Sequence, residues 1–174
     1  MQLSTSSQIA LEPIIENDRI VVWDVADSAS ARAFDAVVVS FSGSVAFLPK
    51  GAPLKIAGRS IVIELKDHPV APIENSSGYA PAFSRPGVRK ILENEQVIVW
   101  DCTWTAAVAA PMHFHDKDIV ALFLDGGDLK STTVDGRSVV NRHGTGDVTF
   151  TPRNRTHTEI SVRGNPHAIF TELK

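Results

Sequence analysis

Three histidines in the second half of the chain have a spacing that could place them around one metal ion. His113 and His115 are separated by a single residue, and His157 follows on a later segment. Side chains two residues apart on a β-strand project from the same face, because strand side chains alternate between faces. A third imidazole from a neighbouring strand would complete a facial set. Imidazole suits Zn, Fe and Ni, and an added carboxylate extends the choice to Mn, so these residues predict a site for one divalent metal ion.

The elements that must hold these histidines are expected to be strands. Short runs rich in Val, Ile, Phe, Thr and Trp are separated by 10 prolines and 11 glycines spread along the chain. Many short strands divided by turn residues are typical of a β-sandwich or β-barrel, and Asp135-Gly136 is a predicted hairpin turn. The expected strands cover residues 20–23, 36–41, 97–104, 119–124, 148–151 and 168–171. The sequence therefore predicts an all-β protein.

The chain also repeats itself. Residues 16–24 (ENDRIVVWD) recur as residues 93–101 (ENEQVIVWD), with five of nine positions identical. Two further matches follow in the same order along the chain, GSVAFLP with GDVTFTP and IELK with TELK. We infer a duplication with an abbreviated first copy. The predicted organisation is a leader (1–15), a shortened first copy (16–66), a proline- and glycine-rich linker packed on the barrels (67–92) and a complete second copy (93–174).

Two segments of the second copy resemble the two sequence motifs of the cupin superfamily. The segment from Pro111 to Asp118, with the apolar run and glycine pair after it, is similar to the first motif. The segment from Gly146 to His157 is similar to the second motif. The resemblance implies jelly-roll barrels, here a degenerate bicupin, in which one divalent metal ion (Fe, Mn, Ni or Zn) is held by histidines and usually a carboxylate. It assigns His113, His115 and His157 as the metal ligands, whereas the corresponding positions of the first copy carry no histidine.

One departure from the first motif concerns the carboxylate ligand. The usual motif has a glutamate four or five residues after its second histidine, and this sequence has Ile119 and Val120 there. Asp118 is the nearest acidic residue. Its odd spacing from His115 points it away from the metal on a regular strand, but a bulge around residues 116–117 would turn it inward.

Glu159 is the alternative fourth ligand, because it has the same strand parity as His157. The sequence leaves Asp118 and Glu159 as equal candidates, and the residue that does not bind the metal is expected to orient an imidazole or to act as a general base. Arg155 shares the same parity and is a candidate for binding a substrate carboxylate. These residues predict a metal site with its own acid–base and substrate-binding groups.

The expected function is that of a mononuclear metal-dependent cupin acting on a small oxygenated substrate, which is acidic, an enediol or a diketone. An iron site would favour dioxygenase chemistry, and Zn, Ni or Mn would favour an isomerase- or lyase-like reaction. The alternative is a non-catalytic, metal-stabilised binding or sensor module. A structural role with an empty site is a third hypothesis, because a fold does not determine its function.

Composition and charge exclude several other classes. The net charge is -3, with 17 Lys+Arg and 20 Asp+Glu, and without a basic tract we expect no binding to nucleic acid or to an anionic membrane. No apolar run reaches the roughly 18 residues of a membrane span. The single cysteine, Cys102, allows no intrachain disulfide and is expected to be a small buried residue. We expect a cytoplasmic protein without a signal peptide, with a small-molecule ligand as partner and homodimerisation through strand edges.

Overall fold

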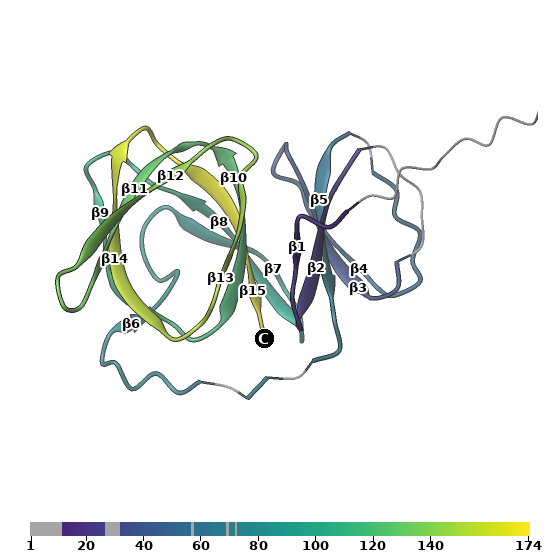
Figure 1. Cartoon of the computed structure of the whole chain (residues 1–174), viewed down its shortest axis with the longest axis horizontal. Coiled ribbons are helices and arrows are strands. Elements are labelled where there is room, and N and C mark those ends of the chain that lie inside the picture. The colour runs from purple at the N-terminus through teal and green to yellow at the C-terminus, as the bar shows by residue number, and fades with distance from the viewer. Residues whose placement is uncertain (1–11, 27–31, 57, 69, 72) are drawn as a thin grey trace, which may run out of the picture. The chain divides into compact units, whose positions relative to one another are not determined.

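The computed structural model describes residues 12–26, 32–56, 58–68, 70–71 and 73–174 (Figure 1). Most of the predicted leader lies outside the described residues. The chain divides into two units, one formed by residues 1–38 and 47–68 and the other by residues 39–46 and 69–174. All secondary-structure elements in the described ranges are β-strands. That part of the chain contains no helix able to cross a membrane.

The first five strands form one sheet in the order β1-β2-β5-β3-β4. A cluster of apolar side chains, with Val25, Ala36, Leu54 and Val62 at its centre, packs on this sheet and is buried. Each of these strands is rich in Val, Ile or Ala, which suits a pleated and half-buried surface. The strands are β1 (Ile15–Glu16), β2 (Ile20–Val25), β3 (Asp35–Ser40), β4 (Val45–Leu48) and β5 (Ser60–Leu65).

The remaining ten strands form two five-stranded sheets, in the orders β13-β10-β15-β8-β7 and β12-β11-β14-β9-β6. The two sheets curl around a common interior as a jelly-roll barrel, which confirms the predicted fold class (Figure 1). The strands are β6 (Ala80–Pro81), β7 (Val88–Glu93), β8 (Val97–Thr103), β9 (Ala109–His115), β10 (Asp118–Asp125), β11 (Gly127–Thr133), β12 (Ser138–His143), β13 (Val148–Thr151), β14 (Arg155–Arg163) and β15 (His167–Leu173).

The barrel interior at one end is filled by apolar and aromatic side chains. Cys102, Ala121, Phe123 and Ala168 form the buried core there, together with Trp104 and Leu129. Cys102 is fully buried, as predicted, and its burial raises the pKa of the thiol. The predicted hairpin at Asp135-Gly136 joins the antiparallel strands β11 and β12, and Gly136 has a positive φ of 83°. Glycine adopts this backbone conformation without steric cost.

The same hydrogen bond between a half-buried tryptophan and a buried glutamate occurs in both units. The indole N–H of Trp23 donates a hydrogen bond to Glu64 at 2.9 Å in the first unit. The indole N–H of Trp100 donates to Glu172 at 2.7 Å in the second. Trp23 aligns with Trp100, and Glu64 with Glu172, in the repeats found in the sequence. Both glutamates are buried, so each indole supplies a donor to a carboxylate that has lost much of its contact with water.

A second contact recurs at the ends of the repeats. Lys66 Nζ donates to Glu16 at 2.8 Å in the first unit, and Lys174 Nζ donates to Glu93 at 2.8 Å in the second. These two ion pairs also occupy aligned positions. Equivalent contacts between equivalent residues support the duplication, which stays a prediction.

Candidate metal centre

Two adjacent strands of one sheet position the three predicted ligands. His113 and His115 lie on β9, and His157 lies on β14. The strands pair antiparallel with His157 directly opposite His113. Because all three side chains lie on the inner face of the sheet, the histidines are buried, with exposures of 9%, 4% and 3%. The alternation of strand side chains thus brings the rings together as expected.

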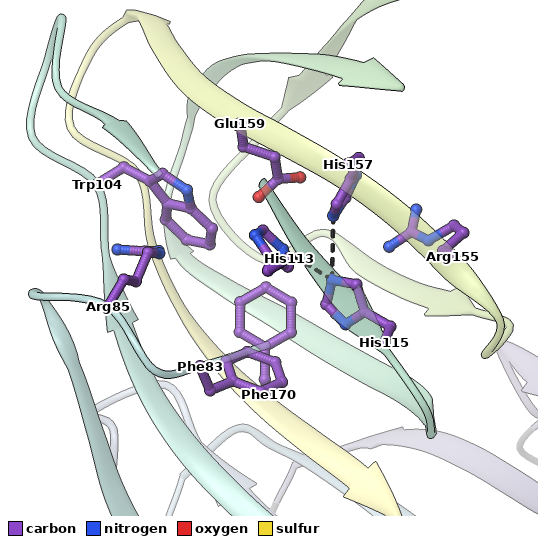
Figure 2. Close-up of a pocket in the computed structure, with 9 residues that line it drawn as sticks. All are labelled: Phe83, Arg85, Trp104, His113, His115, Arg155, His157, Glu159 and Phe170. Atoms are coloured by element: carbon purple, nitrogen blue, oxygen red, sulfur yellow. Dashed lines mark hydrogen bonds between the residues drawn. The ribbon is translucent and has the colours of Figure 1, made fainter. Parts of the chain in front are cut away.

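The ring nitrogens converge on one point (Figure 2). The Nε2 atom of His115 lies 3.0 Å from the Nε2 atom of His113 and 3.0 Å from the Nε2 atom of His157. The three residues form a group whose ligand atoms all lie within 4.8 Å of one another. Two nitrogens at adjacent corners of an octahedron, each about 2.1 Å from its central ion, lie about 3.0 Å apart. Both 3.0 Å spacings therefore fit a pair of adjacent coordination positions, with His115 common to the two pairs.

The outer nitrogens of two rings have partners that orient them. His113 Nδ1 donates to the carbonyl oxygen of Pro111 at 2.7 Å, which leaves Nε2 of that ring as the lone-pair atom that faces the common point. His157 Nδ1 and Ser131 Oγ are hydrogen-bonded at 2.7 Å, whereas His115 Nδ1 is buried without a hydrogen-bond partner among the described residues. Neutral imidazoles suit the predicted divalent ions.

Burial also keeps these rings neutral. Desolvation, together with the nearby His113, His157 and Arg155, lowers the pKa of His115 to about 2. Desolvation, followed by the effects of Arg155 and His113, lowers the pKa of His157 to about 3. The pKa of His113 is lowered too, chiefly by burial. At neutral pH the three imidazoles are therefore neutral, which is the form that binds a metal ion.

The structure does not bring Asp118 to the histidines. β9 ends at His115, and β10 begins at Asp118 in the opposite sheet, so residues 116–117 form the connection between two sheets and not a bulge within a strand. The Asp118 carboxylate accepts a hydrogen bond from the backbone N–H of Arg153 at 2.8 Å. The metal-ligand group found among the described residues contains only the three histidines. Asp118 was predicted as a ligand or catalytic residue, and its position argues against both roles.

Glu159 and Arg155 do lie at the site. Both line the same pocket as the three histidines (Figure 2), which agrees with the shared parity of positions 155, 157 and 159 on β14. Burial raises the pKa of Glu159, while Arg155 and Arg85 oppose the shift. A carboxylate whose pKa is raised beside a metal site is suited to accept a proton and return it.

The sequence analysis did not identify the aromatic wall of the pocket. Phe83 enters the barrel from the segment predicted to be a linker, and its ring stacks on Trp100 with 5.3 Å between centroids. The same ring lies edge-on to His115, at 5.8 Å, and contacts Phe170 at 5.4 Å. Phe83 has a positive φ of 65°, which a bulky residue adopts only when its surroundings compensate for the strain.

Arg85, two residues further along, is the second residue that was missed. Its Nη1 atom donates to the carbonyl oxygens of Pro86 at 2.9 Å and Thr103 at 3.0 Å. Its guanidinium carbon lies 4.8 Å from the centre of the Trp104 ring, a cation–π contact. The apolar residues of the linker indicated that it packs on the barrel, but no local pattern marked Arg85 as a pocket residue.

Comparison with solved structures identifies the fold. The Cupin 2 conserved barrel domain protein from Leptotrichia buccalis matches 99% of this chain over 92% of its own, with a TM-score of 0.54 and 12% sequence identity. A cupin domain from Bordetella pertussis Tohama I matches 52% of this chain over 96% of its own, with 25% identity and a TM-score of 0.46. No protein-family model matches the sequence, and no curated protein does. The chain has the cupin fold.

Proposed function

We propose that this protein is a mononuclear metal-dependent enzyme that transfers a proton on a small oxygenated substrate. The observation that carries the proposal is the convergence of three buried Nε2 atoms at 3.0 Å spacings, with two of the rings oriented through their Nδ1 atoms. His113, His115 and His157 would hold one divalent ion, and Fe, Mn, Ni and Zn all suit this set of ligands.

A bound divalent ion supplies Lewis-acid polarisation of substrate oxygens. Glu159 is the carboxylate of the pocket that can take up a proton from the substrate and return it. Its raised pKa supports this role, because a general base works best when its pKa approaches the working pH. The opposing effects of Arg155 and Arg85 favour the ionised form that accepts the proton.

The aromatic wall supports the same reaction by excluding water. Phe83, Phe170 and Trp104 line the pocket beside the histidines, and apolar walls reduce the competition of water for the proton. Asp118 does not line the pocket, and Glu159 is the one carboxylate among its described lining residues. We therefore assign the acid–base role to Glu159.

Metal analysis tests the first part of the proposal. Protein purified without a tag or chelator should contain, or take up on titration, about one divalent ion per chain. His113→Ala should abolish tight binding, because two imidazoles remain. Stoichiometry well below one that Fe, Mn, Ni and Zn do not raise would refute the metal site.

Glu159→Gln tests the proton-transfer role. The variant should keep the wild-type metal content and lose about 100- to 10,000-fold in rate. The assay is solvent deuterium incorporation into candidate hydroxy-acids, diketones and enediols, followed by NMR. Oxygen uptake with the same compounds or with catechols, at equal rates in wild type and variant, would instead indicate a dioxygenase. Metal binding without turnover of any of these compounds would indicate the binding or sensor module.

A further inference from the structure

We propose that the ligand of this site is a small carboxylate anion recognised by Arg85 and Arg155, and that this anion and the metal ion bind cooperatively. The inference rests on the proposed function for the metal ion, and it narrows the substrate class to organic acids. It follows from the hydrogen-bond donors that the pocket leaves without acceptors and from the charge balance of its lining residues.

Arg85 is held in place before any ligand binds. One of its terminal nitrogens is anchored to two backbone carbonyl oxygens, and the guanidinium lies over the Trp104 ring. Its other N–H groups make no hydrogen bond with a described residue. The segment 80–87 fixes this position. At the start of the segment, β6 pairs parallel with β9, and further along it the Phe83 ring packs inside the barrel. A positioned guanidinium with free donors binds an anion at low entropic cost.

Arg155 is the second cation of the pocket. The residue is exposed, and within the described part of the chain its guanidinium forms neither a hydrogen bond nor an ion pair, with Glu159 as the carboxylate that acts on it electrostatically. Arg85 and Arg155 lie on different sides of the three histidines (Figure 2).

The charges of the pocket are unbalanced. Its lining contains two guanidinium groups, one carboxylate and three imidazoles, and an imidazole binds a metal ion in its neutral form. The formal sum is one positive charge, which a divalent ion would raise to three. A divalent ion would add its charge beside the two guanidinium groups, and none of the metal-ligand residues is a carboxylate. An anion would supply the missing negative charge.

A carboxylate suits both kinds of group. The planar fork of a guanidinium matches the two oxygens of a carboxylate, and a 2-oxo or 2-hydroxy acid has a further oxygen for the metal ion. Because each partner compensates charge for the other, the metal should tighten binding of the acid, and the acid should tighten binding of the metal by the same factor.

Calorimetry with a matched pair of probes tests this inference. Pyruvate and pyruvamide differ by replacement of one carboxylate oxygen with an amino group, so both offer two adjacent oxygens but only pyruvate is charged. Zinc-loaded protein should bind pyruvate at least about 10-fold more tightly than pyruvamide, and more tightly than metal-free protein binds pyruvate. Arg85→Gln and Arg155→Gln should each weaken pyruvate binding about 10- to 100-fold and leave pyruvamide binding unchanged.

Arg153→Gln is the matched control, because the Arg153 guanidinium donates to the carbonyl of Ala71 at 2.6 Å and does not line the pocket. It should bind pyruvate as the wild type does. Zinc stoichiometry measured on the same samples separates the two proposals. Without zinc binding the proposed function fails, whereas arginine-dependent pyruvate binding to metal-free protein would still support the anion site. Equal affinity for pyruvamide and pyruvate, no effect of either arginine substitution, or preference for inorganic phosphate over pyruvate would overturn the carboxylate assignment.

Discussion

Acid should destabilise the metal-free protein through its buried imidazoles. The ordinary histidine pKa is 6.5, and in the folded protein it falls to about 2 for His115 and about 3 for His157. Below about pH 6.5 the unfolded chain therefore binds protons that the folded chain does not. The free energy of unfolding is therefore not reduced by these rings above that pH. It decreases progressively as the pH falls toward the pKa values that the rings have in the folded protein.

The magnitude follows from proton counting. Between about pH 5.5 and pH 4, each of the two rings is protonated only in the unfolded state, and each contributes about 1.4 kcal/mol per pH unit. Together they give roughly 3 kcal/mol per pH unit. The raised pKa values of Glu159 and Glu172 act in the opposite sense, since those carboxylates bind protons more readily in the folded protein.

His115→Gln isolates one contribution. Equilibrium urea unfolding in the presence of a chelator, followed by circular dichroism from about pH 7.5 to pH 4, should show a slope smaller by about 1.4 kcal/mol per pH unit. The carboxylate contributions are common to both proteins and cancel. His68→Gln, at an exposed position, should leave the slope unchanged. If His115→Gln and wild type have equal slopes, the buried imidazole is not the origin of the acid sensitivity.

Three further substitutions test individual contacts. Ser131→Ala removes the partner of His157 Nδ1 and should weaken metal binding about 10- to 100-fold in a competition titration. Trp100→Phe removes the indole donor to the buried Glu172 and should lower the free energy of unfolding by about 1–3 kcal/mol in urea. Gly87→Ala places a Cβ atom 2.8 Å from a backbone oxygen at a φ of +80° and should cost about 1–3 kcal/mol by the same measurement.

Each result has an opposite that would contradict it. Unchanged metal affinity in Ser131→Ala would mean that the ring of His157 is oriented by its packing alone. Wild-type stability of Trp100→Phe would show that water replaces the indole donor. A Gly87→Ala protein as stable as wild type would show that the segment beside Thr103 moves freely, and Arg85 would then lack the fixed position that we assign to it.

The histidines and most strands could be predicted because their signals are local. Alternation along β9 and β14 places His113, His115 and His157 on the inner faces, and turn residues separate the strands. The same parity places Arg155 in the pocket. These features depend on residues within one strand, so the sequence contains the information needed to find them.

The choice between Asp118 and Glu159 could not be made locally. It depends on whether residues 116–117 form a bulge within one strand or a connection between two sheets. An Asp-Lys pair is compatible with either structure. The pocket contacts of Phe83 and Arg85 depend on tertiary packing of a segment whose prolines and glycines are typical of a linker. Homodimerisation through strand edges and a cytoplasmic location stay predictions, which ultracentrifugation and cell fractionation would test.

The entry of Arg85 from outside the barrel strands has an evolutionary consequence. The residues that would bind the metal ion lie in β9 and β14. One of the residues that would bind the organic acid, Arg85, lies upstream of them, in residues 80–87. Substitutions in this one short segment could therefore change which acid the pocket prefers, while the metal ligands stay the same. Chimeras that exchange this stretch between homologous chains would make new specificities accessible in a single step.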